Sequence, residues 1–142
     1  MKLLIATLLF ISSVTLSAQS NQFAGNYSRS LSEKEKHTVE YKLTLNPNGT
    51  FEFHSYSKIQ GGNPAEDNKY GKGKWSAKDN LITFSANKKE DFDSKYTLDF
   101  TNSSARFVTK NPRDKSDKVV KTKLQFLESE IFWMKGIDIF KS

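Results

Sequence analysis

The sequence predicts an all-β protein, an antiparallel up-and-down barrel of about eight to ten strands that follows an N-terminal signal peptide. Short segments with apolar residues at alternate positions recur along the chain, and clusters of turn-forming residues separate them at close intervals. After the first eighteen residues, apolar side chains do not recur at helical spacing. Such a meander closes into a barrel or a sandwich, and closure removes the exposed strand edges that promote aggregation.

Residues 1–18 have the three parts of a secretory signal peptide. Lys2 provides the positive start, residues 3–11 are apolar, and small residues lead to Ala18 before the expected cleavage site. The apolar run is shorter than the roughly 20 residues that span a bilayer. We therefore expect an exported protein, periplasmic or secreted, whose mature domain covers residues 19–142.

The chain combines many aromatic residues with a complete absence of cysteine. Its eleven Phe, five Tyr and two Trp suffice for the hydrophobic core of a single domain. Without cysteine, disulfides, thiolate metal ligands and a cysteine nucleophile are excluded. No other apolar run approaches membrane-spanning length, so we expect no stable membrane insertion. The net charge of +6 becomes +5 when Lys2 is removed with the signal peptide.

The clearest strand pair lies in the first half of the mature domain. In residues 38–45 every second side chain is apolar, which is typical of a strand with one buried face. The sequence Asn-Pro-Asn-Gly at 46–49 predicts a tight turn, and residues 50–57 form the partner strand. We expect Phe51 and Phe53 of this partner strand to face inward.

The remaining segments follow the same alternation. Further strands are predicted at 70–76, 80–86, 95–100, 105–110, 119–127, 130–135 and 137–141. Residues 32–37 are polar and predict a turn. The longest predicted connector, 59–69, is rich in Gly, Asn and Pro; it would form either a lid at the barrel mouth or, more commonly, a solvated hairpin loop.

Gly71 and Gly73 interrupt a predicted strand and need a reason of their own. A glycine within a strand marks a bulge, a bend or a close approach of another part of the chain. Trp75, which follows them, is large enough to close the end of a barrel or to pack beneath a strand. The two glycines do not indicate a phosphate-binding loop, because neither a third glycine nor a helix follows.

Three stretches combine turn residues with packing residues in a recognisable order. Residues 23–27 contain a glycine followed two positions later by an aromatic, and residues 43–53 join a strand to an Asn-Gly-Thr-Phe turn. Residues 70–85 carry a Gly-x-Trp, a short polar turn and a Leu-Ile-Thr-Phe strand. In this order, over about residues 23–100, the chain resembles small exported lipocalin-like domain proteins of bacteria. The resemblance implies a lipocalin-like barrel.

Residues that could support catalysis or metal binding occur without the necessary spacing. The two histidines, His37 and His54, lie in different segments, and a zinc site would need further ligands from distant carboxylates. The acidic group Glu90, Asp91 and Asp93 lacks the glycine and the distal glutamate of a calcium loop, which favours a solvated turn. No G-x-S-x-G sequence is present. We expect a protein that is not an enzyme, with no catalytic residues, no metal site and no cofactor.

One predicted hairpin is rich in basic residues, namely Lys110, Arg113, Lys115, Lys118, Lys121 and Lys123. Such a stripe could contact an anionic lipid, a polysaccharide or a nucleic acid. Export argues against a nucleic acid, and Asp114 and Asp117 weaken the positive field. A solvated strand face is the favoured interpretation, and we expect no nucleic-acid partner.

The inward-facing side chains bear most directly on function. The candidates are Tyr41, Leu43, Phe51, Phe53, Trp75, Phe84, Tyr96, Leu98, Phe100, Leu124, Phe126 and Trp133. An eight-stranded barrel has an interior that is either filled by side chains or just wide enough for one small ligand. The leading interpretation is an exported lipocalin-like barrel that binds a small, largely apolar molecule in or at the mouth of the barrel. The predicted ligand-binding residues are Tyr41, Phe53, Trp75, Phe84, Tyr96 and Trp133.

The alternative interpretation is a filled barrel of the cell envelope that acts through its outer surface, by interaction with a protein or a glycan. On the predicted pattern Glu52, His54 and Tyr56 lie on the outer face of their strand. A large apolar pocket inside the barrel would favour the first interpretation, and a packed interior with an exposed aromatic patch would favour the second. The sequence identifies no partner protein.

Overall fold

The computed structural model describes residues 21–34 and 36–142. These residues form nine strands and no helix. The strands are β1 (Gly25–Glu33), β2 (His37–Leu45), β3 (Thr50–Ile59), β4 (Glu66–Lys78), β5 (Leu81–Ser85), β6 (Tyr96–Leu98), β7 (Ser103–Val108), β8 (Lys123–Glu128) and β9 (Asp138–Lys141). All of them except β6 form a closed antiparallel up-and-down barrel. The predicted all-β barrel is confirmed, whereas the predicted signal peptide at 1–18 lies outside the described residues.

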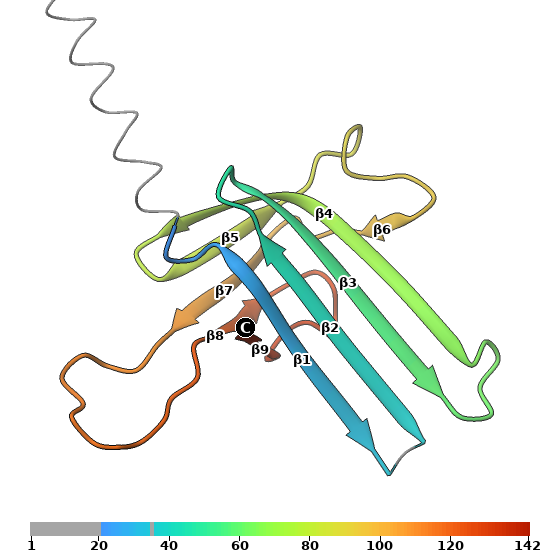
Figure 1. Ribbon diagram of the computed structural model, residues 1–142. Helices are drawn as coiled ribbons and strands as arrows, with labels where there is room; N and C mark the ends of the chain where they lie inside the picture. The colour runs from blue at the N-terminus through green and yellow to red at the C-terminus, as the bar shows by residue number, and fades with distance from the viewer. Residues whose placement is uncertain (1–20, 35) are drawn as a thin grey trace, which may run out of the picture.

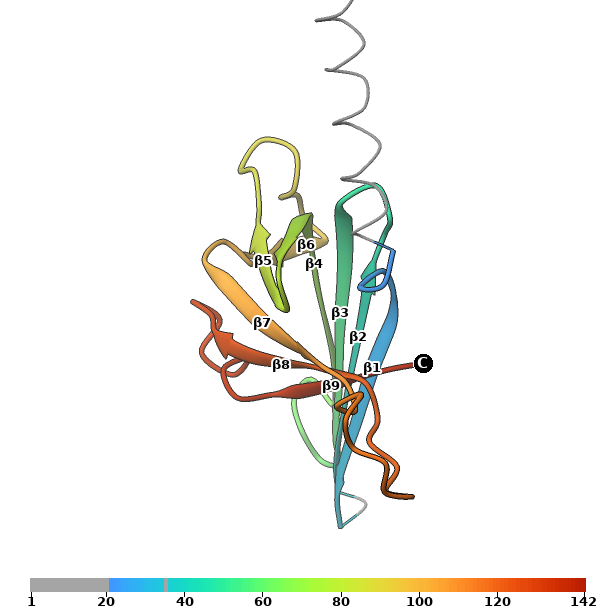
Figure 2. The same cartoon turned by 90° about the vertical axis from the view of Figure 1, so that its left-hand side faces the viewer.

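The barrel strands follow one another in chain order around the barrel. Each strand pairs with its neighbour in the sequence, β5 pairs with β7, and β9 returns to β1. The long strands β1 to β4 lie side by side in Figure 1, and Figure 2 shows β7, β8 and β9 crossing them at a steep angle. Within the described part of the chain, no helix is long and apolar enough to cross a membrane.

The additional strand β6 lies against β4. It pairs with β4 in parallel, Tyr96 opposite Tyr70 and Leu98 opposite Gly71. One edge of β4 pairs with β3, and its other edge pairs with β5 only from Lys74 onward. Therefore β6 occupies the part of the second edge that β5 does not reach.

Two connectors differ from the prediction. The connector predicted at 59–69 is shortened to residues 60–65, because the pairing of β3 with β4 continues almost to the ends of both strands. The basic hairpin is instead an irregular loop at 109–122, which projects from the barrel in Figure 1. Of the six basic residues grouped by sequence, Lys123 lies in a strand and the other five lie in this loop.

The segment 130–135, predicted as a strand, forms a turn between β8 and β9. The backbone nitrogen of Met134 donates to Ile131 O at 3.0 Å, and that of Ile137 donates to Met134 O at 3.1 Å. Trp133 and Met134 are sequence neighbours that both pack on the core, which the alternation of a strand does not allow. The strand prediction was wrong because these apolar residues pack over the core from a series of local turns.

Aromatic rings pack tightly within the barrel. The ring centroid of Phe84 lies 5.1 Å from that of Phe51, 6.0 Å from that of Phe100 and 5.5 Å from that of Phe126. Edge-to-face and offset contacts at such distances are favourable. The residues of this buried cluster are Phe23, Tyr27, Tyr41, Leu43, Leu45, Phe51, Phe53, Trp75, Ile82, Phe84, Phe100, Ala105, Leu124, Phe126, Met134 and Ile139.

Gly71 and Gly73 allow this packing, as their place within a strand indicated. A Cβ atom at Gly71 would lie 2.7 Å from Cε2 of Phe100, and one at Gly73 would lie 2.1 Å from the backbone oxygen of Ser85. Side chains do not tolerate contacts this short unless their neighbours move. The Phe100 ring and the end of β5 can therefore lie against β4 only because both positions lack a side chain.

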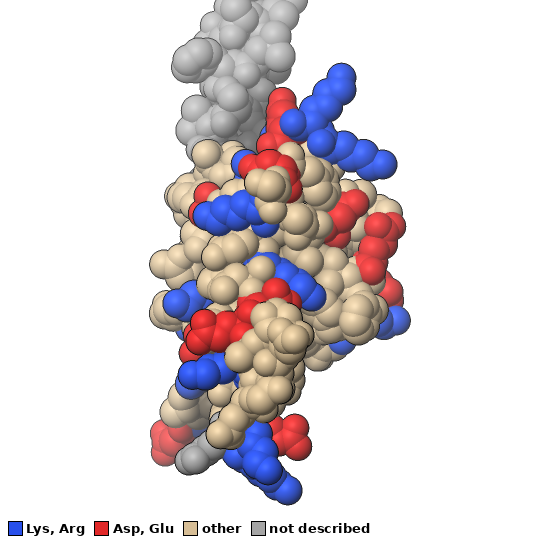
Figure 3. All heavy atoms as spheres, turned by 90° about the vertical axis from the view of Figure 1, so that its right-hand side faces the viewer, with Lys and Arg blue, Asp and Glu red and all other residues tan. Residues whose placement is uncertain are grey.

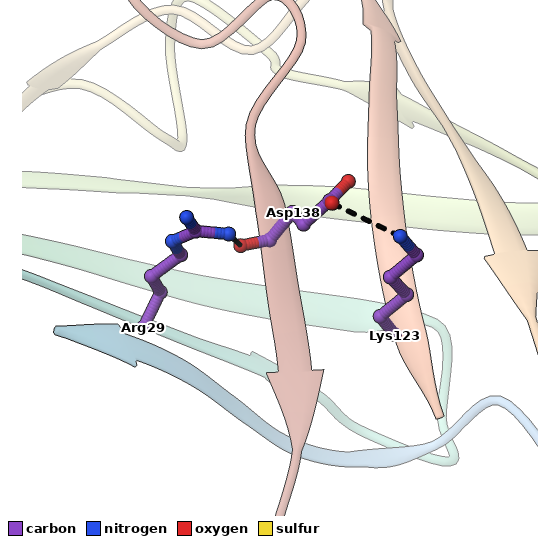
Figure 4. Close-up of polar contacts among 3 residues, drawn as sticks. All are labelled: Arg29, Lys123 and Asp138. Carbon is purple, nitrogen blue, oxygen red and sulfur yellow. Dashed lines mark hydrogen bonds and ion pairs between the residues drawn. The ribbon is translucent and has the colours of Figure 1, made fainter. Parts of the chain in front are cut away.

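The barrel closes through a short seam between β1 and β9. The residue pairs of this ladder are Tyr27 with Lys141 and Ser28 with Phe140. Beyond the ladder, the Arg29 guanidinium donates a hydrogen bond to the backbone oxygen of Asp138 at 3.2 Å (Figure 4). The Asp138 carboxylate accepts a hydrogen bond of 3.0 Å from Lys123 on β8. Arg29 thus provides a partner for a backbone oxygen at the point where β1 and β9 separate.

Replacement of Gly73 by alanine should strongly destabilise the barrel, because the new methyl group would overlap a backbone oxygen that cannot rotate away. We expect the free energy of unfolding in urea to fall by about 3 kcal/mol, a large effect among overpacking substitutions. Lys74→Ala, at the adjacent exposed position, is the control and should change this free energy by less than about 0.5 kcal/mol. Equal stabilities of the Gly73→Ala variant and the wild type would contradict the close contact.

Candidate functional site

The predicted ligand-binding residues Tyr41, Phe53 and Trp133 meet in the structure. The ring centroid of Trp133 lies 5.4 Å from that of Tyr41 and 6.1 Å from that of Phe53. The rings of Tyr41 and Trp133 are nearly parallel, with an interplanar angle of 10°. Tyr41 is 8% exposed, and Trp133 is partly buried against the core. The space between these three residues is therefore occupied by their own rings.

Trp75 and Phe84 belong to other parts of the core. The Trp75 Nε1–H group donates to the backbone oxygen of Asn46 at 3.0 Å, so this side chain stabilises the turn between β2 and β3. Phe84 belongs to the ring cluster with Phe51, Phe100 and Phe126. Both residues face inward as predicted, and both act there as packing residues.

Tyr96 lies on the outer face of the barrel and not in its interior as predicted. Its ring centroid lies 5.9 Å from that of Tyr70 and 4.6 Å from Nζ of Lys72. Tyr70 and Lys72 alternate along β4 with the buried Gly71 and Gly73, so they point outward. Tyr96 joins this outer row because β6 pairs with β4 beside Tyr70.

The outer face around Tyr96 contains a hollow of about 250 Å³, which we call the aromatic–lysine site. Its lining residues are Lys42, Thr44, Glu52, Phe53, His54, Tyr70, Lys95 and Tyr96. We include Lys72, which contacts the ring of Tyr96. Figure 3 views the molecule from the side of β3 and β4, where basic and acidic side chains alternate with uncharged surface.

His54 and Tyr70 stack face to face across β3 and β4. They form a cross-strand pair, their ring centroids lie 4.5 Å apart, and the interplanar angle is 4°. His54 Nε2 lies 2.8 Å from Asn68 Oδ1. With a proton on Nε2 the ring donates to this oxygen, and Nδ1 of the neutral ring is left to accept. The orientation of the His54 ring is thus set by the protein itself.

Two lysine side chains lie against the tyrosine rings. Lys95 Nζ is 4.7 Å from the ring centroid of Tyr70 and 5.4 Å from that of Tyr96. Lys72 Nζ is 4.6 Å from the ring centroid of Tyr96. An ammonium group at these distances from a ring is attracted by the electron-rich ring face. The rings therefore hold two positive charges in defined places on the outer surface.

Asp93 positions the chain on which Lys95 and Tyr96 lie. Its Oδ1 accepts hydrogen bonds of 2.8 Å from the backbone nitrogens of both residues. These bonds, first that from Tyr96 and then that from Lys95, lower the pKa of the Asp93 carboxyl group. Asp91 accepts a bond of 2.6 Å from the nitrogen of Asn87. The acidic segment is therefore a turn whose carboxylates bind backbone groups.

Other residues considered from the sequence lie apart from this site. His37 pairs with Ile59, five residues beyond His54 on β3, so the two histidines are separated. Tyr56 lies on the outer face of β3 as predicted, and its pKa is raised by partial desolvation and by Glu66. Among residues 21–34 and 36–142, no group of three or more His, Asp and Glu side chains could hold a metal ion.

No family model, curated protein or solved structure matches the chain. The architecture is established by the structure alone, as an eight-stranded antiparallel barrel with a buried aromatic cluster and one extra strand. The lipocalin-like relationship therefore remains a prediction from the sequence.

Part of the aromatic–lysine site is visible in the sequence. Alternation along β4 places Tyr70 and Lys72 outward, opposite the glycines, and His54 was predicted on the outer face. The sequence reasoning missed Tyr70, and it assigned Tyr96 to the interior. Lys95 and Tyr96 join the site through the parallel pairing of β6 with β4, which no local pattern reveals.

Trp133→Ala and Phe132→Ala should differ sharply although the positions are adjacent. Phe132 is 90% exposed, so its replacement should change the free energy of unfolding by less than about 0.5 kcal/mol. Trp133 would lose its contacts with Tyr41 and Phe53, and we expect a loss of about 2 to 3 kcal/mol for this partly buried ring. Urea unfolding followed by circular dichroism measures both. Equal losses would contradict the position of Trp133 over the core.

Proposed function

We propose that the protein is a binding protein that recognises its ligand at the aromatic–lysine site, on the outer face of a filled barrel. The observation that carries this proposal is the position of Lys72 and Lys95, whose ammonium groups lie 4.6 to 5.4 Å from exposed-face tyrosine rings beside a hollow. In this proposal residues 1–18 direct the protein out of the cytoplasm. Its ligand is then a glycan or a protein of the cell envelope.

The chemistry of the site supports binding. Ligand sites combine apolar or aromatic surface with a few convergent polar groups, and this hollow offers both. Tyr70 and Tyr96 form the aromatic part of the site and hold the lysine ammonium groups. Lys95, Glu52 and His54 supply donors and acceptors. We assign no catalytic step to these groups.

The side chains of the site are also preorganised before a ligand binds. The stack with Tyr70 and the contact with Asn68 orient the ring of His54, and Asp93 orients the backbone of Lys95 and Tyr96. A site whose side chains are already held loses less conformational entropy when a ligand binds. This preorganisation favours binding of a specific ligand over non-specific binding of many molecules to the protein surface.

A second candidate function is binding of a small apolar molecule at the end of the core. Trp133 supports it, because this ring comes from a turn and not from a barrel strand. A ligand would have to replace the stacked contact of Trp133 with Tyr41. This candidate corresponds to the lipocalin-like function that the sequence resemblance implies.

Substitution of two aromatic residues tests the proposed site. The purified protein and a His54→Ala/Tyr96→Ala variant are applied to an array of neutral and acidic oligosaccharides and synthetic peptides. We expect the wild type to bind a subset of these probes and the double variant to bind them at least about tenfold more weakly, as expected when aromatic anchors are removed. Phe132→Ala, which removes an exposed aromatic elsewhere, should bind as the wild type does.

An apolar probe separates the two candidate functions. In a Trp75→Phe variant, Trp133 is the single tryptophan and its fluorescence is followed during titration with a long-chain fatty acid. The outer-face proposal predicts no saturable change. A saturable change in Trp133 emission, together with failure of every array probe to bind, would contradict the proposal and favour the second candidate.

A further inference from the structure

We infer that the ligand of the aromatic–lysine site is an acidic polysaccharide, bound through its negative charges and its hydroxyl groups. This inference rests on the proposed function and adds the class of ligand. Three features of the site support it: the tyrosine ring faces are covered, the lysines outnumber the carboxylates, and the hollow contains hydrogen-bond acceptors.

The ring faces at the centre of the site are already covered. The His54 ring lies parallel to Tyr70 at 4.5 Å, so the Lys95 ammonium, 4.7 Å from the Tyr70 centroid, lies over the opposite face. Tyr96 carries Lys72 and Lys95 within 5.4 Å of its centroid. A purely apolar ligand would have to displace these ammonium groups from the rings. An anionic ligand can instead contact them where they are.

The positive charges of the site are only partly balanced. Lys42 lines the hollow with Lys95, and Lys72 lies at its border. Two carboxylates belong to the same region: Glu52 lines the hollow, and Asp93 interacts electrostatically with Lys72 and Lys95. The Asp93 carboxylate also accepts two backbone hydrogen bonds, so its negative charge is shared between these bonds and the two lysines. An incoming carboxylate or sulfate group would therefore gain favourable contacts with Lys72 and Lys95.

Glu52 distinguishes a sugar from a simple polyanion. A carboxylate can only accept hydrogen bonds, so at the wall of the hollow Glu52 repels phosphates and carboxylates but accepts from hydroxyl groups. Thr44, opposite Glu52 on β2, donates its hydroxyl hydrogen to Asn26 Oδ1 at 2.9 Å, so its oxygen can still accept a hydrogen bond. A ligand that contacts both the lysines and the acceptors Glu52 and Thr44 carries negative charges next to many hydroxyl groups. Acidic polysaccharides have this combination, whereas acidic peptides have few hydroxyl groups.

The contacts with the tyrosine rings also reduce the entropy that Lys72 and Lys95 would lose when they bind a ligand. A free lysine side chain samples many rotamers, and fixing it on a ligand costs side-chain entropy. Lys72 and Lys95 are already held over the tyrosine rings, so part of this loss has occurred before binding. Their ammonium groups remain at the surface, where a polymer chain can reach them.

Binding of three polymers tests the inference. Polygalacturonate is the acidic polysaccharide, dextran the neutral one and poly-glutamate the acidic polypeptide, and each is titrated into the purified protein by isothermal calorimetry. We expect measurable affinity for polygalacturonate and at least about tenfold weaker affinity for the other two. Binding should weaken strongly in about 1 M salt, where the Debye length is about 3 Å.

Two double variants with the same change of charge provide the control. Lys72→Ala/Lys95→Ala removes the ring-held lysines and should weaken binding of polygalacturonate about tenfold, whereas Lys115→Ala/Lys118→Ala in the 109–122 loop should weaken it less than about twofold. Both pairs are surface residues, and unchanged melting temperatures show that the variants fold. Equal weakening by both variants would overturn the inference, because it would mean that only net charge matters.

The remaining outcomes separate the inference from the proposed function. If dextran binds as tightly as polygalacturonate and His54→Ala/Tyr96→Ala abolishes both, the proposed site stands and the acidic ligand class is wrong. If poly-glutamate binds most tightly, the ligand is an acidic protein segment and the inference is overturned. If none of the polymers binds, the acidic polysaccharide is excluded, and the array result decides on the proposed function.

Discussion

Close packing around β4 requires that Gly71 and Gly73 carry no side chain. A Cβ atom at either position would overlap Phe100 or the backbone of Ser85. Because these positions are empty, β5 can end against β4 and the Phe100 ring can enter the core, where it contacts Phe51 and packs near Phe84. The buried aromatic cluster and the close approach of strands around β4 therefore have a common cause.

The same constraint connects the core to the outer face. On β4 the two glycines face inward. Tyr70, which precedes Gly71, and Lys72, which lies between the glycines, therefore face outward. The chain that brings Phe100 into the core passes along β4 as β6, and its first residue, Tyr96, lies outside against Tyr70. One pairing of strands thus brings Phe100 into the buried cluster and Tyr96 into the aromatic–lysine site. The aromatic–lysine site on the surface and the packing of Phe100 inside are two consequences of how β6 lies on β4.

Local alternation was enough to predict much of the barrel but not its irregular parts. The strand pair β2 and β3, with Phe51 and Phe53 buried, was predicted because period-two patterns flank a clear turn. The turn that carries Trp133 was predicted as a strand, since its apolar residues reveal burial but not backbone geometry. The outward position of Tyr96 depends on a parallel contact with β4, and the sequence around residue 96 contains no trace of that contact.

The most direct test of the account is an NMR titration of isotope-labelled protein with oligogalacturonate. The resonances to compare are the backbone amides of His54, Tyr70 and Tyr96 and the indole N–H signals of Trp75 and Trp133. A filled barrel that binds through its outer face predicts shifts of the three amide signals with both indole signals unchanged. Shifts confined to the indole signals would show that the ligand enters the core, and would contradict the account.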